Sequence, residues 1–173
     1  DIRVIGVVAE GVPSLKKSME IGKLVEVSSI STIADGIAVK KIGENCFPII
    51  QENADQIVSV SDDSMASAIL RLLEEERMLA EAAGAAPLAS LFDKKAEING
   101  KTVALICGGN LDVNLLSRII GKGLALNNRY AKLQVPLHDV PGALTRLSQI
   151  VSEERVNIIH IENDMIKFTC SEI

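Results

Sequence analysis

The sequence predicts an α/β protein built on part of an open, mostly parallel sheet with helices on both faces. Short apolar runs alternate with helical patterns along the chain, which is typical of β-α-β units. The runs are nearly continuous, as in strands that are buried on both faces. Ala, Val, Ile and Leu must fill the core, because only 2% of the 173 residues are aromatic.

The first third of the chain supplies a strand, two helices and a second strand. Residues 3–8 form an apolar run that predicts the first strand. Ser14 can cap a helix that ends at Gly22, since glycine readily adopts the left-handed conformation of a helix end. Residues 47–53 predict a short helix, and residues 56–60 (QIVSV) predict the second strand.

The clearest helix follows the cap residues at 61–64. Its apolar positions fall on one face, at the spacing i, i+4, i+7 and i+8. They are Met65, Ile69, Leu72 and Leu73. The segment 80–89 comes next and is almost entirely small, so a second backbone or a flat ligand can approach it closely.

A third strand is predicted at 102–106 (TVALI), and it runs directly into Cys107 and Gly108. A helix follows at about 112–120. In open α/β sheets ligands sit beyond the carboxyl ends of strands, and glycine permits close backbone approach. Cys107 and Gly108 are therefore the strongest local indication of a site. A buried structural cysteine before a tight turn is the alternative interpretation.

The pattern of apolar and polar residues changes after residue 126. Residues 133–137 alternate like a half-buried strand, residues 139–142 (DVPG) start a helix, and residues 157–161 predict a second strand. This pattern is a partial β-α-β unit. We therefore expect two domains, 1–126 and 130–173.

Composition excludes several function classes. The net charge of −5 argues against a generic nucleic-acid binder, and the scarcity of aromatics argues against base-stacking platforms. No apolar run reaches the length of a membrane span, and three separated cysteines form no disulfide framework. We expect a cytoplasmic chain. Because it opens and closes within strand-like sequence, we also expect it to be a fragment of a longer protein.

Several motifs together resemble the later part of the catalytic domain of the threonine/serine dehydratases. These enzymes use pyridoxal 5'-phosphate and have a tryptophan-synthase-β-like fold. The matching segments occur in the family's order, at residues 1–7, 9–11, 31–40, 80–89 and 107–120. The resemblance implies conversion of L-threonine to 2-oxobutanoate and ammonia, with L-serine as the neighbouring substrate.

The same resemblance implies four cofactor-binding residues. Cys107 stands where the family has a serine or cysteine that hydrogen-bonds the pyridine nitrogen, and Gly108 keeps that approach open. Gly36 matches a glycine whose backbone lies beside the ring, and Glu81 matches a carboxylate near the nitrogen. Taken alone, Gly36 is also typical of a turn and Glu81 of a solvent-facing acid.

No catalytic residue is assigned, because no lysine of this chain matches the family's Schiff-base lysine and no segment matches its phosphate loop. We therefore expect the chain alone to be inactive. Some relatives bind a divalent cation through acids at the positions of Val8 and Ser14. Since these residues supply no carboxylate, we predict no metal there.

Residues 130–165 resemble the start of an ACT regulatory domain, which has a ferredoxin-like fold. This resemblance implies allosteric control and a homo-oligomer, either a dimer or a tetramer. It places Asp139, Gly142 and Asn157 at the effector interface. A helix cap, a turn glycine and a strand-start asparagine are equally acceptable interpretations of these three residues.

Two alternative functions stay open at this point. The chain is either an enzyme part or a non-catalytic regulatory or assembly segment that uses its ACT-like portion. Within the enzyme interpretation, a serine-preferring dehydratase or racemase relative is the second possibility.

Overall fold

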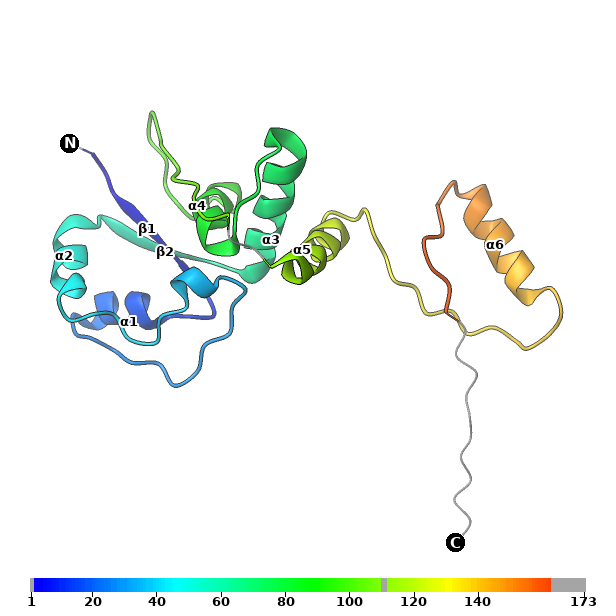
Figure 1. Ribbon diagram of the computed structural model, residues 1–173, viewed down its shortest axis with the longest axis horizontal. Helices are drawn as coiled ribbons and strands as arrows, with labels where there is room; N and C mark the ends of the chain where they lie inside the picture. Colours follow the sequence, from blue (N-terminus) through cyan, green and yellow to red (C-terminus); the bar gives the residue numbers. More distant parts are fainter. Residues whose placement is uncertain (1, 110–111, 163–173) are drawn as a thin grey trace, which may run out of the picture. The chain divides into compact units, whose positions relative to one another are not determined.

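The structure is a computed structural model that describes residues 2–109 and 112–162 (Figure 1). It divides into two compact units, Asp1–Ala131 and Lys132–Ile173. The domain limits expected from the sequence, 1–126 and 130–173, concern family domains and stay a prediction. None of the described helices combines the length and apolar character needed to cross a membrane.

A parallel pair of strands lies at the centre of the first unit. β1 (Ile5–Ala9) pairs with β2 (Gln56–Val60), so that Ile5 lies opposite Gln56 and Ala9 opposite Val60. The predicted strands at 3–8 and 56–60 are confirmed, although the first begins two residues later. The chain between them contains α1 (Ser14–Ile21), the short 3-10 turn η1 (Asp35–Ile37) and α2 (Cys46–Asn53).

α1 ends as predicted, because Gly22 adopts a left-handed φ of 73°. The predicted cap is wrong, since Ser14 lies inside the first turn of the helix. Its buried hydroxyl donates a 2.5 Å hydrogen bond to the carbonyl oxygen of Val39 instead. A buried hydroxyl must find a partner, and here the partner is the chain that follows η1.

The core lies where α3 packs against α4. α3 (Asp62–Arg71) continues into the π-helical turn η2 (Leu72–Glu76), and α4 spans Ala82–Phe92. The Ser61 hydroxyl accepts a hydrogen bond from the Ser64 amide, which confirms the predicted cap. The predicted stripe is also confirmed: Met65 and Ile69 have no exposed surface, Leu72 is buried and Leu73 is half-buried. Figure 1 shows α1 and α4 on opposite sides of the strands.

α5 (Val113–Leu126) is longer than predicted. It begins after Asp112, whose carboxylate accepts a 2.7 Å hydrogen bond from the Asn114 amide. The helix continues through Gly121 and Gly123, beyond the predicted end at about residue 120. A Cβ at Gly123 would lie 3.1 Å from Cδ2 of Leu70, so this glycine serves the close packing of α5 on α3.

The strand predicted at 102–106 does not form. The segment has no regular structure, and the side chains of Val103 and Leu105 are 93% and 72% exposed. A strand is stabilised by hydrogen bonds to a neighbour. Within residues 2–109 and 112–162, the only strands that pair are β1 and β2.

In the second unit the predicted helix is confirmed as α6 (Ala143–Glu153), which begins after Gly142 at a φ of 89°. The strands predicted at 133–137 and 157–161 are irregular instead. None of the residues 132–162 is buried, so an alternating strand has no core to cover there. Residues 163–173 of the predicted ACT-like unit lie outside the described residues.

Candidate functional site

Three segments that are far apart in the sequence meet at the beginning of α4. They are η1, the residues 81–84 at the start of α4, and the irregular residues 107–108. The amide of Glu81 donates a 2.8 Å hydrogen bond to the carbonyl oxygen of Gly108. The four residues that the sequence predicted around the cofactor ring, Gly36, Glu81, Cys107 and Gly108, all belong to this meeting point.

Gly108 fits this position for two separate reasons. Its φ is 78°, a conformation that residues with a side chain rarely adopt. A Cβ there would also lie 2.5 Å from Cγ of Glu81 and would overlap the Glu81 carboxyl group. The Glu81 side chain therefore covers the Gly108 backbone directly.

Gly36 also lies close to the Glu81 carboxyl group. A Cβ at Gly36 would be 3.3 Å from Oε1 of Glu81 and 3.1 Å from Cβ of Ala83. Glu81 is half-buried and lies against both glycines, so it is not simply a solvent-facing acid. Its carboxylate makes no ion pair with any residue in the described part of the chain.

Gly84 is the residue that sequence reasoning missed. A Cβ at this position would overlap the carbonyl group of Cys107 and would lie 3.1 Å from the Cys107 nitrogen. The small residues at 80–89 indicated close approach by a backbone or a ligand. At Gly84, the backbone of residue 107 fills that space.

Cys107 carries a free, exposed thiol. The alternative interpretation, a buried structural cysteine, is therefore wrong. Its backbone is held against Gly84, and its neighbour Gly108 is hydrogen-bonded to Glu81. The thiol thus stands on a short segment that α4 fixes through backbone contacts.

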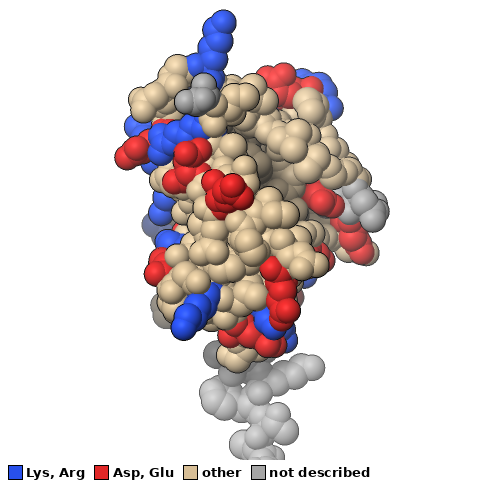
Figure 2. Space-filling view, turned by 90° about the vertical axis from the view of Figure 1, so that its left-hand side faces the viewer, with Lys and Arg blue, Asp and Glu red and all other residues tan. Residues whose placement is uncertain are grey.

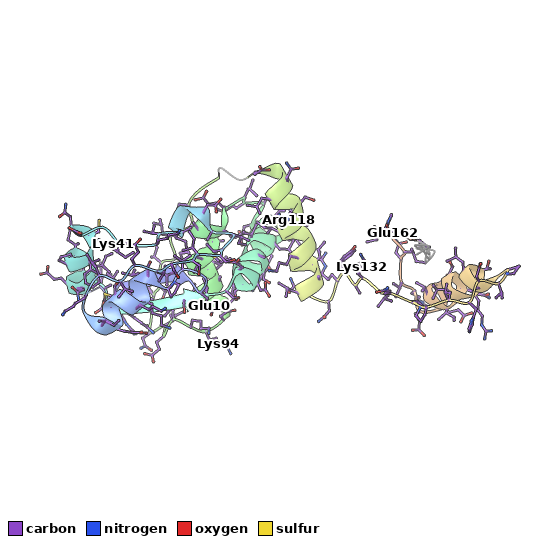
Figure 3. The ribbon with its side chains drawn as sticks, turned by 90° about the horizontal axis from the view of Figure 1, so that it is seen from below. Glu10, Lys41, Lys94, Arg118, Lys132 and Glu162 are labelled. Atoms are coloured by element: carbon purple, nitrogen blue, oxygen red, sulfur yellow. The ribbon has the colours of Figure 1, made fainter. Side chains whose placement is uncertain are left out.

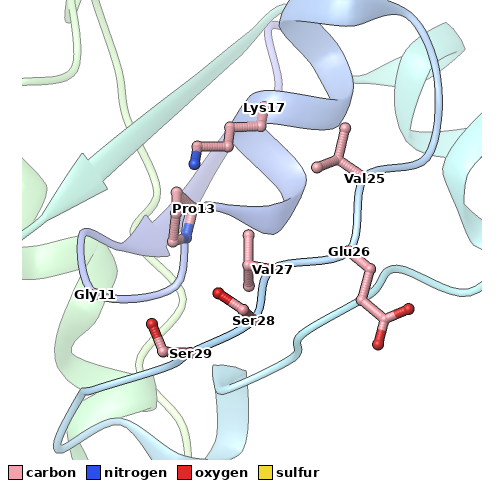
Figure 4. Close-up of a pocket in the computed structure, with 8 residues that line it drawn as sticks. All are labelled: Gly11, Pro13, Lys17, Val25, Glu26, Val27, Ser28 and Ser29. Atoms are coloured by element: carbon pink, nitrogen blue, oxygen red, sulfur yellow. The ribbon is translucent and has the colours of Figure 1, made fainter.

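Two cavities lie elsewhere in the first unit. One of about 310 Å³ lies between α1 and the loop 25–29, with Lys17 on the helix and Ser28 and Ser29 on the loop (Figure 4). The other, of about 400 Å³, is lined by Ile33 and by α5, which carries Arg118 (Figure 3). Among the described residues that line them, none is a predicted cofactor residue.

The surface charge is mixed. Figure 2 shows acidic and basic side chains interspersed among uncharged ones on the face that it presents. In the segment between Val8 and Ser14, where we predict no metal, Glu10 forms a 4.0 Å ion pair with Lys95, and Ser14 is buried. The absence of a metal there stays a prediction.

The three residues of the predicted effector interface lie in the second unit. Gly142 immediately precedes α6 and has the left-handed φ already noted. Asp139 and Asn157 are exposed and lie in irregular segments on either side of the helix. Their role at an effector interface stays a prediction.

A parallel β-α-β unit followed by a glycine-lined wall places the chain among α/β proteins that bind ligands through their loops. Residues 1–108 match the family described as "Pyridoxal-phosphate dependent enzyme". This stretch is more than half of the chain. The chain therefore belongs to the family of pyridoxal-phosphate-dependent enzymes.

Two relatives are threonine ammonia-lyases. The chain is 45% identical over 164 residues to the L-threonine ammonia-lyase of Geobacter sulfurreducens, covering 94% of this chain and 41% of that protein. It is 41% identical over 162 residues to the enzyme of the same name from Thermotoga maritima, covering 93% and 40% respectively. The chain thus spans about two fifths of the length of these relatives.

The fold is similar to that of solved threonine deaminases. The processed form of threonine deaminase isoform 2 from Solanum lycopersicum superposes with a TM-score of 0.63 at 33% identity, covering 69% of this chain and 34% of that chain. The predicted α/β fold class, of the tryptophan-synthase-β-like type, is confirmed.

Proposed function

We propose that this chain forms the ring-side wall of the cofactor site in a pyridoxal-phosphate-dependent L-threonine ammonia-lyase. The observation that carries the proposal is the convergence of Gly36, Glu81, Cys107 and Gly108 at the beginning of α4. These residues lie up to 72 positions apart in the sequence, from 36 to 108. The names of the two bacterial relatives supply the substrate, L-threonine.

The residues present fit a flat aromatic cofactor. Gly36 and Gly108 both lie against the Glu81 carboxyl group, so this wall offers a planar ring two backbones without side chains and one carboxylate. The exposed Cys107 thiol can hydrogen-bond a ring nitrogen as a weak donor or acceptor. Pyridoxal phosphate, when bound, withdraws electrons from an amino acid and so promotes loss of its α-hydrogen and β-hydroxyl.

Cys107 in this role would limit how strongly the ring attracts electrons. An aspartate carboxylate would hold the pyridine nitrogen protonated, whereas a thiol lacks the charge to do so. Loss of a β-hydroxyl needs only a brief accumulation of negative charge, so a weaker attraction is sufficient and disfavours side reactions such as transamination. In this proposal, the lysine that binds the cofactor and the phosphate loop come from the part of the enzyme outside this chain.

The test is a cofactor titration of the complete enzyme that contains this chain. We expect the visible absorbance band of lysine-bound pyridoxal phosphate, and covalent trapping of the cofactor by borohydride. Turnover of L-threonine should release 2-oxobutanoate and ammonia. Absence of this band in the complete enzyme would overturn the proposal. A kcat/KM higher for L-serine than for L-threonine would identify serine as the main substrate.

We further propose that the second unit is the beginning of an ACT-like regulatory domain in a cytoplasmic homo-oligomer, a dimer or a tetramer. Asp139, Gly142 and Asn157 would then contribute to an amino-acid effector site. The free thiols of Cys46 and Cys107 fit a reducing compartment such as the cytoplasm. Loss of effector response in Asp139→Ala, with unchanged activity in the absence of effector, would support this role. An unchanged response would contradict it.

A further inference from the structure

A carboxylate on α3 is tied to the turn that leads into η1. Oδ1 of Asp62 accepts a 2.7 Å hydrogen bond from the Thr32 hydroxyl, and Oδ2 accepts a 3.2 Å bond from the Ile33 amide. The Thr32 hydroxyl oxygen in turn accepts a 3.1 Å bond from the Ala34 amide. One carboxylate and one hydroxyl thus bind two consecutive backbone amides.

We propose that Asp62, acting through Thr32, is the positioning residue that sets the place of Gly36 beside the cofactor ring. This inference rests on the proposed function, since it assumes that Gly36 lies against the ring. Neither residue touches the cofactor in this account. They act on the backbone that carries Gly36.

The bonded turn is continuous with the site. The Ala34 carbonyl oxygen accepts a 3.1 Å hydrogen bond from the Ile37 amide, so the residue whose amide is bonded to Thr32 also begins η1. Ala34 itself is buried. η1 has no side-chain cap of its own, and it is only three residues long. A turn this short has little stability alone, and the bonds from Thr32 and Asp62 hold the residues that lead directly into it.

Asp62 also links the turn to the helices that hold the rest of the site. It is the first residue of α3, and α3 packs along α4, the helix that follows Glu81 and contains Gly84. A carboxylate is stabilised at the positive end of a helix, which favours the acceptor role of Asp62. The same helix pair therefore fixes Gly36, through Asp62, and the Cys107 backbone, through Gly84.

The neighbouring residue Asp63 provides a matched control. It occupies the same first turn of α3 but is exposed, and its carboxylate pairs with Lys122 of α5 and not with the turn at 32–34. Asp63→Asn removes the same charge as Asp62→Asn from the same helix end. Any effect of Asp62→Asn that Asp63→Asn lacks must come from the bonds to Thr32 and Ile33.

The experiment measures two quantities in the complete enzyme prepared without cofactor. The first is the dissociation constant of pyridoxal phosphate, obtained by absorbance titration. The second is hydrogen exchange of the amides in residues 33–38, obtained by mass spectrometry. We expect Thr32→Val and Asp62→Asn to weaken cofactor binding about tenfold, as for loss of a hydrogen bond to a charged group, and to speed exchange in this segment.

Thr32→Ser and Asp63→Asn should behave differently. Thr32→Ser keeps the hydroxyl and should restore binding to within about threefold of the unchanged enzyme, since the same bonds can form. Asp63→Asn should leave both quantities unchanged. Melting temperatures of all variants show whether the fold is retained.

The outcomes separate this inference from the function on which it rests. Unchanged cofactor affinity or unchanged exchange in both Thr32→Val and Asp62→Asn overturns the positioning role and leaves the proposed function intact. Equal weakening by Asp63→Asn also overturns it, because the effect would then come from the helix end. If the unchanged enzyme binds no pyridoxal phosphate, the proposed function fails, and the role of Asp62 toward the cofactor fails with it.

Discussion

Residues 56–60 and residues 102–106 have similar apolar sequences, but only the first segment forms a strand in the structure. Residues 56–60 form β2, which is paired along its whole length with β1 and carries the buried side chains of Val58 and Val60. Residues 102–106 are irregular, and the side chain of Val103 is almost fully exposed. The apolar pattern shows that a segment can be buried, but a neighbouring strand decides whether it is.

The difference matters because Cys107 and Gly108 follow the unpaired segment directly. In the described structure, no sheet holds this part of the chain. Two features hold it instead, the approach of Gly84 to the Cys107 carbonyl and the hydrogen bond from the Glu81 amide. The candidate site thus depends on α4 more than on the strand that precedes it.

The largest effect is expected from Gly84→Ala in the complete enzyme. The new Cβ would overlap the Cys107 carbonyl, so α4 and residues 107–108 must move apart. We expect a loss of about 3 kcal/mol in the free energy of unfolding, at the upper end of overpacking costs, and loss of cofactor binding. Urea unfolding and cofactor titration measure the two effects.

Gly121→Ala is the matched control. Gly121 lies inside α5, and nothing would lie within 4 Å of its Cβ. The same substitution should therefore stabilise the protein by about 0.5–1 kcal/mol, because alanine favours the helix interior. If Gly84→Ala were equally harmless, residues 107–108 would not be held by α4.

The next effect in size concerns the side chain of Cys107. Cys107→Asp replaces the thiol by a carboxylate that would hold the pyridine nitrogen protonated. We expect kcat/KM for L-threonine to fall about a hundredfold, which corresponds to about 2.7 kcal/mol, with a larger share of side products. Cys107→Ser should keep most of the activity. Full activity in the aspartate variant would remove this account of the thiol.

Much of the fold could be predicted from local sequence. Ser61 beside a periodic apolar stripe identified α3, and Gly22 identified the end of α1, because caps and periodicity act within a few residues. The length of α5 could not be predicted in this way. Gly123 lies beyond the predicted end at about residue 120, and the proximity of Leu70 on α3 explains why a glycine is there.

The candidate site could be predicted only in part. The resemblance to a known family suggested Gly36, Glu81, Cys107 and Gly108, and the structure brings these four residues together. The sequence alone could not single out Gly84 among the small residues at 80–89. The partner of Gly84 is the backbone of residue 107, which lies 23 positions further along the chain. A contact of this range leaves no local pattern in the sequence.

A smaller effect tests whether residues 102–106 become a paired strand in the complete enzyme. Leu105 is largely exposed here, and a polar residue at such a position changes stability by only about 0.5 kcal/mol. If strands outside this chain cover the segment, Leu105→Asn should instead cost about 2 kcal/mol. Thermal unfolding of the complete enzyme distinguishes the two values, with the exposed Lys101→Gln as control. A change no larger than that of the control would mean that the segment stays irregular.

The smallest effect is expected on the outer side of the α3–α4 pair, where contacts are exposed. Arg71 donates a 3.0 Å hydrogen bond to Glu75 and lies 3.9 Å from the centre of the Phe92 ring. The hydrogen bond from Arg71 lowers the pKa of the Glu75 carboxyl below its ordinary value. Because the pKa is lowered in the folded state, this pair stabilises the protein at pH values above the ordinary pKa of a glutamate.

That contribution should disappear as the pH falls through the lowered pKa of Glu75, because protonation removes the charge that Arg71 binds. Glu75→Gln should therefore flatten the acid side of the stability profile slightly, whereas Glu76→Gln, at an exposed neighbouring position, should leave it unchanged. Urea unfolding across the acidic range measures the difference. Arg71 and Glu75 are both exposed, so the effect of Glu75→Gln on stability should stay well below that of Gly84→Ala. An effect of similar size would mean that exposed contacts of α3 and α4, and not only their close inner packing, hold the wall of the site.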